Sequence, residues 1–400
     1  MKTAIYTLTS ELHDETAVEA VTRDFLGELG LDYDFKGSLY DDYGSHPLDL
    51  IYVRTGGTEG IFKRLLPVLL EKSDRPFYLL TSGKSNSLAA SMEILTYLNQ
   101  QGIKGEILHG SAEYINSRIA ALLAKERLIG CRLGVIGKPS DWLISSHADY
   151  TVLRERLGLE IVDIPMEEVL EALSEQHTDS VSWNLAQDHR LEQKSVTLVQ
   201  DAVPGAIRIY EALNTVVRNH HLGGFTIRCF DLLTTLRNTG CLALAKLNSE
   251  GIVAGCEGDV PTMVSMKIVQ ALTGMSGFQA NPSNINPETG EISFAHCTIP
   301  LDMVERYELD THFESGIGVG IRGFMAEGDV TIFKVSGDLS RSFIAEGTLI
   351  RNEAKPDRCR TQQVIQLLDK SQASYFLTEP VGNHHVIVPG HLKAMLKLFL

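Results

Sequence analysis

The chain has 400 residues, of which 44% are hydrophobic and 22% charged, values typical of a globular protein with two or three domains. Its 51 acidic and 36 basic residues give a formal net charge of -15, and no long block of either sign concentrates that charge. The composition therefore excludes wholesale disorder and counts against a nucleic-acid or anionic membrane partner.

The lack of a predicted targeting signal and the low number of cysteines both favour a cytoplasmic location. No run of 18 apolar residues predicts a transmembrane helix, and the short apolar stretch at residues 3–8 lacks the features of a signal peptide. The six cysteines form no CxxC pair and are too sparse for a disulfide scaffold. We therefore expect a cytoplasmic protein with reduced thiols.

The first part of the chain alternates short apolar runs with amphipathic segments. Apolar runs predict strands at 3–8, 50–53, 76–80 and 105–108, and helical spacing predicts helices at 15–30, 59–71, 88–101 and 112–127. Strands separated by helices of this length predict right-handed crossovers and a parallel sheet. We expect a first Rossmann-like α/β domain over residues 1–129.

A second series of the same kind follows. Strands are predicted at 133–136, 160–164, 225–230 and 252–255, and helices at 166–174, 205–219, 241–248 and 262–272. The turn at 137–141 has the composition of a strand-to-helix connection with Asp141 as its N-cap. We expect a second Rossmann-like, doubly wound domain over residues 130–288.

After about residue 286 the pattern changes to short alternating segments split by glycine turns. These segments are residues 318–324, 329–335, 342–350, 363–368 and 385–388, with a short helix at 391–400. Strands at this spacing predict a β-rich, barrel-like C-terminal domain over residues 289–400.

Loops that follow parallel strands are the default ligand positions of such sheets. In the first domain the loops at 54–59 and 81–87 make Thr55, Glu59 and Lys84 candidates for substrate binding. Their glycines could offer backbone N–H groups to a phosphate or a sugar hydroxyl, although neither loop is a P-loop and no GxGxxG motif follows the first strand. Ordinary turn chemistry is the alternative interpretation.

Two carboxylates, Glu257 and Asp259, follow the strand predicted at 252–255. Carboxylates at a strand end can bind a hard divalent cation or act as general bases. The alternative is an aspartate N-cap next to an exposed glutamate.

Three histidines could complete a metal site with Glu257. His296 lies in an apolar strand, where a buried core imidazole is the alternative. His384 and His385 are adjacent in an extended segment, so their side chains point to opposite faces and at most one of them faces a given site. Glu257, His296 and one of this pair would form a mixed oxygen and nitrogen set suited to Mn²⁺ or a similar divalent ion.

Four segments resemble the L-fucose/L-arabinose isomerase-like family, and a shortened branch of that family most of all. They are residues 247–259, 295–297, 313–316 and 382–385, and they occur in the family's order within a similarity that spans about residues 225–400. The resemblance implies two Rossmann-like domains and a β-rich C-terminal domain. It also implies Mn²⁺-dependent aldose–ketose isomerisation through a cis-enediol(ate), and a homo-oligomer, trimeric or hexameric.

The resemblance also assigns roles to individual residues. Glu257 matches a metal-liganding, catalytic glutamate of the arabinose isomerases, and Asp259 matches the aspartate that the fucose isomerases use in the same frame. His296 and His384 match metal ligands, with His385 as the alternative if the register slips by one residue.

One departure from the family concerns the second carboxylate. The arabinose isomerases carry an essential glutamate on the next strand, at a position that falls within residues 278–281 of this chain, where neither Ala280 nor Asn281 can ionise. In the fucose-type arrangement only Asp231 could supply the second carboxylate. We expect Arg228, Asn281 and Asn383 to bind the substrate, and weak or absent turnover of free L-fucose and L-arabinose.

Two other functions stay open. One is a non-catalytic carbohydrate-binding or regulatory protein that uses the same cleft. The other is a different isomerase or lyase with Cys229 or Cys256 as acid or base.

Overall fold

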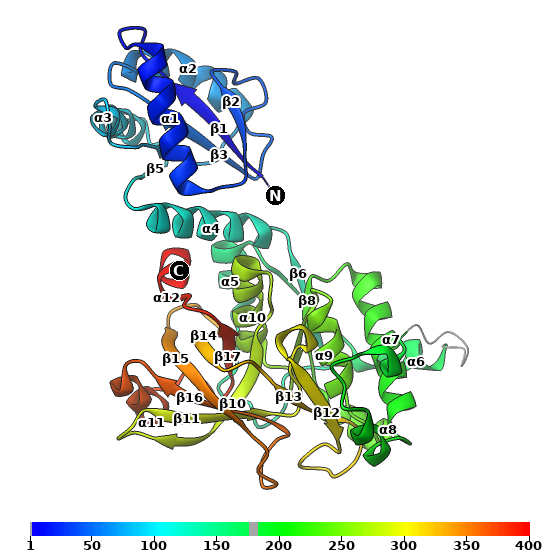
Figure 1. Ribbon diagram of the computed structural model, residues 1–400. Helices are drawn as coiled ribbons and strands as arrows, with labels where there is room; N and C mark the ends of the chain where they lie inside the picture. The colour runs from blue at the N-terminus through cyan, green and yellow to red at the C-terminus, as the bar shows by residue number, and fades with distance from the viewer. Residues whose placement is uncertain (1, 176–182) are drawn as a thin grey trace. The chain divides into compact units, whose positions relative to one another are not determined.

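The computed structural model describes residues 2–175 and 183–400 (Figure 1). The chain divides into two compact units: Met1–Glu126 with Lys397–Leu400, and Arg127–Leu396. No helix within the described ranges is long and apolar enough to cross a membrane.

The first unit contains a parallel sheet of five strands in the order β2-β1-β3-β4-β5. The strands are β1 (Thr3–Leu8), β2 (Tyr33–Gly37), β3 (Leu48–Val53), β4 (Phe77–Leu80) and β5 (Gly105–Leu108). β1 and β3 are buried along their whole length, as expected for a parallel sheet that is covered on both faces.

Four helices cover this sheet: α1 (Glu15–Leu29), α2 (Glu59–Lys72), α3 (Ser87–Gln100) and α4 (Ala112–Leu128). Apolar residues of α1 and α4 share one core cluster and those of α2 and α3 share another, so helices lie on both faces. The ends of α1 follow capping rules, because the Asp14 side chain accepts a hydrogen bond from the Ala17 N–H and Gly30 ends the helix in the left-handed conformation.

The second unit contains a parallel sheet of four strands in the order β7-β6-β8-β9. The strands are β6 (Arg132–Ile136), β7 (Glu160–Ile164), β8 (Gly224–Ile227) and β9 (Val253–Cys256). The helices of this region are α5 (Tyr150–Leu157), α6 (Met166–Ser174), α7 (Val203–His220), α8 (Phe230–Leu236), α9 (Cys241–Ser249) and α10 (Val260–Thr273).

Two local predictions for this region were wrong. The strand expected at 225–230 ends at Ile227, and α8 begins at Phe230. Asp141 is not an N-cap, because α5 begins only at Tyr150, where the Asp149 side chain accepts hydrogen bonds from the first turn. The Asp141 carboxylate instead accepts hydrogen bonds from an arginine of the neighbouring strand end.

The second unit also contains a closed antiparallel barrel of six strands in the order β10-β11-β16-β15-β14-β17. These are β10 (Phe278–Asn286), β11 (Glu291–His296), β14 (Gly328–Val335), β15 (Ser342–Glu353), β16 (Thr361–Leu367) and β17 (His385–Pro389). β12 (Arg306–Asp310) and β13 (Gly320–Phe324) pair separately, so the strand expected at 318–324 lies outside the barrel. Two short helices, α11 (Tyr375–Thr378) and α12 (Lys393–Phe399), flank β17 in the sequence.

The barrel packs directly against the helical part of the second unit. One core cluster joins the barrel interior to α7 and α9, and α10 contacts β14 and β17. The fold is therefore mixed α/β with parallel sheets and a closed barrel, and the barrel includes a strand, β10, within the range expected for the second α/β domain. The Rossmann-like character of the two sheets and the boundaries at 129 and 288 stay predictions.

Candidate metal centre

Glu257 lies in the tight turn between β9 and α10. Its φ of +64° and that of Gly258, +74°, are both in the left-handed region. A Cβ on Gly258 would stand 2.5 Å from the Lys138 carbonyl oxygen, so only glycine fits there. Asp259 then caps α10 by accepting a hydrogen bond from the Thr262 N–H at 2.9 Å. The turn thus presents two carboxylates at the carboxyl end of a buried strand.

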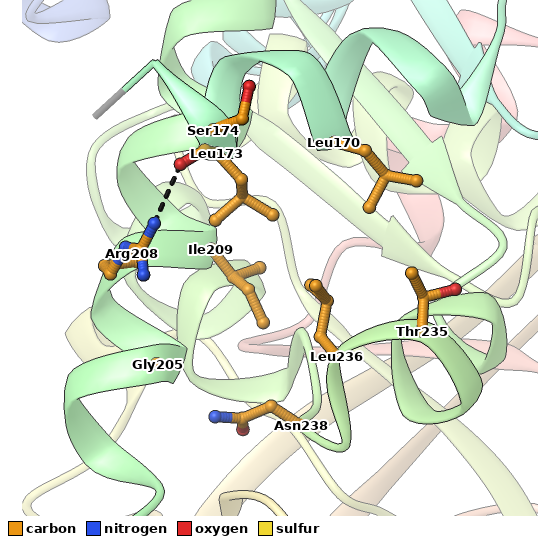
Figure 2. Close-up of a pocket in the computed structure, with 9 residues that line it drawn as sticks. All are labelled: Leu170, Leu173, Ser174, Gly205, Arg208, Ile209, Thr235, Leu236 and Asn238. Carbon is orange, nitrogen blue, oxygen red and sulfur yellow. Dashed lines mark hydrogen bonds between the residues drawn. The ribbon is translucent and has the colours of Figure 1, made fainter.

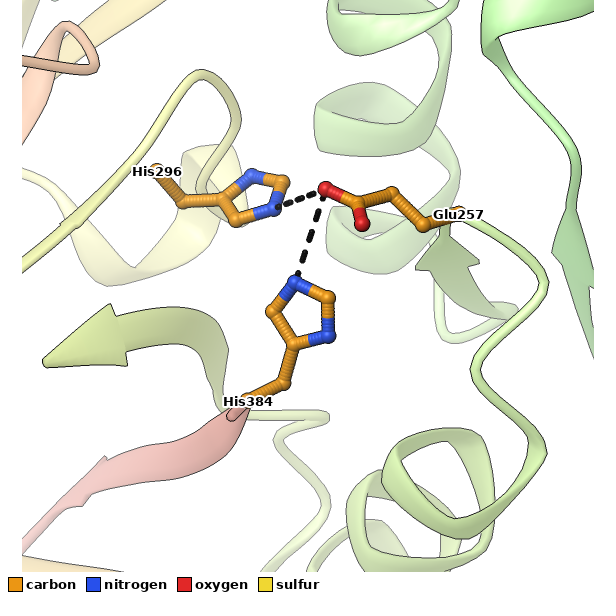
Figure 3. A group of neighbouring side chains, drawn as sticks. All are labelled: Glu257, His296 and His384. Atoms are coloured by element: carbon orange, nitrogen blue, oxygen red, sulfur yellow. Dashed lines mark ion pairs between the residues drawn. The ribbon is translucent and has the colours of Figure 1, made fainter. Parts of the chain in front are cut away.

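Glu257 lies beside two histidines that come from distant parts of the sequence (Figure 3). Its Oε1 is 3.8 Å from Nε2 of His296, at the end of β11, and 3.6 Å from Nε2 of His384, just before β17. The three potential ligand atoms all lie within 4.8 Å of one another. The expected convergence of these three side chains is therefore confirmed.

The environment of His384 fits a metal ligand. Its Nδ1 lies 2.9 Å from Oδ2 of Asp259, which accepts the ring N–H, whereas its buried Nε2 has no hydrogen-bond partner among the described residues. Metal-ligating histidines commonly donate their other nitrogen to a carboxylate in this way. Two ligand atoms that each lie about 2.1 Å from one ion, in directions at right angles to each other, stand about 3 Å apart. Small side-chain rotations would bring the ligand atoms of the cluster to that separation.

The pKa values of the cluster reflect its two carboxylates. Burial alone would lower the pKa of His384, but the carboxylate of Asp259, which accepts its ring N–H, and the nearby charge of Glu257 raise it to about 9. Burial would raise the pKa of Glu257, yet the two histidines hold it well below its usual range. Burial lowers the pKa of His296, which keeps its imidazole neutral at pH 7, the form that binds metals.

A buried lysine that the sequence reasoning missed balances the second carboxylate. Lys334, 1% exposed on β14, places its Nζ 3.5 Å from both oxygens of Asp259, which is 0% exposed, and also donates to the Thr262 hydroxyl. Burial would raise the pKa of Asp259, but Lys334 and His384 hold it well below its usual range. The only signal in the sequence was a lysine inside the apolar segment of β14.

Trp142 and Gln279 were also missed. The indole N–H of Trp142 donates to Oε2 of Glu257 at 2.7 Å. The side-chain amide of Gln279, on β10, accepts from the Cys256 N–H at 2.9 Å and so ties the barrel to the end of β9. Each contact joins residues that are not neighbours in the sequence, so no local sequence pattern predicts it.

An amide pair lies next to the histidines along the chain. Nδ2 of Asn383 donates to Oδ1 of Asn281 at 3.0 Å. Asn281 pairs in the barrel with Ala295, the residue before His296, and Asn383 directly precedes His384. These two side chains donate and accept hydrogen bonds but do not ionise, and their role in substrate binding stays a prediction.

Arg228 and Asp231 are engaged in ion pairs. The Arg228 guanidinium donates to both oxygens of Asp141, at 2.7 and 3.1 Å, and to Asp231 at 3.1 Å. Asp141 is strongly exposed, whereas the Arg228 side chain is largely buried. The roles expected for Arg228 in substrate binding and for Asp231 in catalysis stay predictions.

The three candidates of the first unit differ in burial and in their contacts. The buried Thr55 hydroxyl accepts a hydrogen bond from the Ser10 N–H at 3.0 Å, Glu59 starts α2, and Lys84 is exposed. A cavity of about 500 Å³ opens at the carboxyl ends of β1 and β3 and is lined in part by the buried Arg54. Substrate binding by these residues stays a prediction.

His385 points away from His384, as the alternation of an extended segment predicts. Its Nε2 lies 3.0 Å from the Tyr375 hydroxyl, and burial lowers its pKa to about 3. The two thiols proposed for acid–base chemistry, Cys229 and Cys256, are buried with their sulfurs 3.0 Å apart. The hydrogen bond between them and their burial raise the pKa of Cys256. A raised pKa keeps a thiol protonated and unreactive near neutral pH.

A cavity of about 400 Å³ lies beside α6 and α7, separate from the metal cluster (Figure 2). Its lining is mainly apolar and comprises Leu170, Leu173, Ser174, Gly205, Arg208, Ile209, Thr235, Leu236 and Asn238. Arg208 at its rim donates to the Leu173 carbonyl at 2.8 Å.

Comparison with known proteins finds similarity to sugar isomerases. No family model matches the chain. It is 33% identical over 92 residues to the sulfoquinovose isomerase of Clostridium sp. (strain MSTE9), covering 23% of this chain and 21% of the relative. It is 22% identical over 231 residues to that of Alkalicoccus urumqiensis, covering 56% and 52%, and 23% identical over 218 residues to that of Priestia aryabhattai, covering 51% and 47%. The chain thus spans about a fifth to a half of the length of these relatives.

Proposed function

We propose that this protein is a metal-dependent sugar isomerase that interconverts an aldose and a ketose. The observation that carries the proposal is the buried, unpartnered Nε2 of His384, which faces Oε1 of Glu257 beside His296, within the described part of the chain. Three relatives named sulfoquinovose isomerase support the reaction class.

Aldose–ketose isomerisation moves a proton between neighbouring carbons, through a cis-enediol in this proposal. The reaction needs a base near those carbons and stabilisation of the negative charge that develops on the oxygens. Glu257, His296 and His384 would hold a divalent cation such as Mn²⁺. When bound, this ion would polarise the carbonyl group of the sugar as a Lewis acid.

The carboxylates near the cluster have different roles in proton transfer and in positioning. Glu257 is ionised at neutral pH and its Oε1 faces Nε2 of both histidines, where the sugar carbonyl would be bound, so we assign it the transfer of the substrate proton. Asp259 is 0% exposed and accepts the ring N–H of His384, which suits it to orienting that histidine rather than to exchanging protons with a substrate. Asp231 stays the candidate for a second base if it is released from Arg228.

The substrate class follows from the polar groups around the cluster. Asn281 and Asn383 offer amide donors and acceptors that can bind sugar hydroxyls. Sulfoquinovose is the first sugar to test because the relatives carry its name. We propose weak or absent turnover of free L-fucose and L-arabinose, with binding retained, because neither amide can act as a base.

The Asn281–Asn383 pair also favours a second candidate function. A protein that binds a carbohydrate at this site without converting it needs the hydrogen-bonding groups but no second base. Turnover separates the two functions, since both require sugar binding. For either one we propose a homo-oligomer, trimeric or hexameric, to be tested by analytical ultracentrifugation, and the cytoplasmic location stays a prediction.

The test combines metal analysis with a turnover screen. Protein purified without chelator is analysed for Mn²⁺ and other divalent ions, and ketose formation is then measured with sulfoquinovose, L-fucose and L-arabinose. We expect about one ion per chain and ketose formation from at least one sugar, both lost in Glu257→Gln. The matched control is Glu288→Gln in an exposed turn, which should keep both.

Two outcomes would contradict the proposal in different ways. If the protein retains no divalent ion, even after dialysis against Mn²⁺, the proposed metal centre is refuted. Protein that binds the ion and a sugar but forms no ketose would favour the carbohydrate-binding function.

A further inference from the structure

We propose that Trp142 is a positioning residue of the metal centre, whose indole N–H fixes the Glu257 carboxylate so that its other oxygen faces the two histidines. This inference rests on the metal site proposed above. It assigns a function to a side chain that makes no contact with the ion itself.

The two oxygens of Glu257 have different partners. Oε2 accepts the Trp142 N–H at 2.7 Å, whereas Oε1 lies 3.6 and 3.8 Å from the ring nitrogens of His384 and His296. A short hydrogen bond to one oxygen of an ionised carboxylate is strong and restricts rotation of the group. Trp142 therefore selects which oxygen is presented to the histidines.

The loop that carries Trp142 is fixed to the Glu257 turn at further points. The Ser140 N–H donates to the Glu257 carbonyl at 2.9 Å, and Gly258 packs so closely on Lys138 that it leaves no room for a Cβ. The indole ring packs edge-on against Phe230 with centroids 4.8 Å apart. These contacts hold the indole N–H in place, although half of the Trp142 surface is exposed.

A purely structural role is the competing explanation, in which Trp142 only anchors the loop through its ring. Trp142→Phe separates the two, because it keeps an aromatic ring against Phe230 and removes the N–H. Outer groups that orient metal ligands typically change metal affinity about 10- to 100-fold when removed. We expect Trp142→Phe to weaken Mn²⁺ binding by this factor in equilibrium dialysis without sugar, with an unchanged midpoint of urea unfolding in EDTA.

The matched control is the protein's second tryptophan. The sequence contains only two, and Trp183 packs on Tyr210 of α7 rather than on Glu257. Trp183→Phe should bind Mn²⁺ as the wild type does. It also leaves Trp142 as the single indole fluorophore, so Mn²⁺ should change its emission spectrum, whereas the emission of Trp142→Phe should stay constant.

The outcomes are distinguishable. If the wild type binds no divalent ion, the proposed metal site itself fails. If the wild type binds Mn²⁺ and Trp142→Phe binds it equally well, the positioning role is overturned. Should Trp142→Phe not fold, the emission of Trp183→Phe decides, and a spectrum that Mn²⁺ leaves unchanged refutes the inference.

Discussion

The buried pair of Asp259 and Lys334 gives the sharpest quantitative prediction. We expect Asp259→Asn to destabilise the metal-free protein strongly, because it removes the counter-charge of Lys334, which is 1% exposed, and the carboxylate that accepts the ring N–H of His384. The asparagine can still accept a hydrogen bond from the Thr262 N–H, so the helix cap is largely retained. The loss should therefore come mainly from the charge.

The magnitude follows from the separation of the two groups. At 3.5 Å and an effective dielectric constant of about 20, the attraction is about 5 kcal/mol. Removing one partner of a buried pair costs about 3–5 kcal/mol, because the remaining charge stays desolvated. Burial already lowers the pKa of Lys334, so part of this cost can be relieved by loss of its proton. We expect a loss of about 3 kcal/mol for Asp259→Asn.

A double-mutant cycle with Lys334→Met tests the reasoning. Methionine keeps the unbranched apolar stem of lysine and removes the charge. Free energies of unfolding are measured with urea in EDTA for the wild type, both single variants and the double variant. The double variant should be more stable than the summed single effects predict, by about 1.5–3 kcal/mol. Effects that add to within about 0.5 kcal/mol would refute the coupling.

Three further predictions concern the same region. The pKa of His384 is raised from an ordinary 6.5 to about 9, so protonation of His384 stabilises the metal-free protein by about 3 kcal/mol below pH 6.5, and this stabilisation is lost as pH rises through 9. Urea unfolding in EDTA should therefore give a higher free energy of unfolding at pH 6 than at pH 9. The variant His384→Gln should reduce this difference between the two pH values. Iodoacetamide at pH 7 should leave Cys229 and Cys256 unmodified by mass spectrometry, and rapid alkylation with loss of activity would instead support the thiol mechanism. Gly258→Ala should lower the free energy of unfolding by more than Gly274→Ala. Both glycines have a positive φ, but a Cβ at 258 would meet the Lys138 carbonyl oxygen, whereas a Cβ at 274 meets open space among the described residues. Equal losses of stability would contradict the close packing at Gly258.

Much of the architecture could be predicted from local patterns. Most of the parallel strands are short apolar runs and most of the longer helices are amphipathic, so their order and type follow from residues that are neighbours in the sequence. The edge strand β2, with the sequence YDFKG, and the short helix α5 were not predicted. The errors occurred where local signals were weak. Residues 137–149 contain glycine and proline but no helix, and α8 is too short to show a clear period.

The metal cluster could be predicted as a set of residues but not as a geometry. Glu257 follows a buried strand, and the alternation at His384 and His385 limits which of the two faces the site. Lys334 and Trp142 escaped notice because their roles depend on contacts with residues more than 70 positions away. The Lys334 contact arises from the packing of the barrel on α10, and the Trp142 contact joins the loops that follow β6 and β9, so no short stretch of sequence shows either one.

The amide at Asn281 changes the charge of the cluster as well as its proton chemistry. Glu257 and Asp259 carry one negative charge each and Lys334 one positive charge, so neutral histidines and a divalent ion would leave a formal charge of +1. A carboxylate in place of Asn281 would reduce that charge to zero. Net positive charge in a buried site favours an anionic substrate and the negative charge that develops on an enediol. Under the proposed function, an amide rather than a carboxylate at Asn281 would both remove a base and leave the buried site more positive, so negatively charged sugars belong first in the turnover screen.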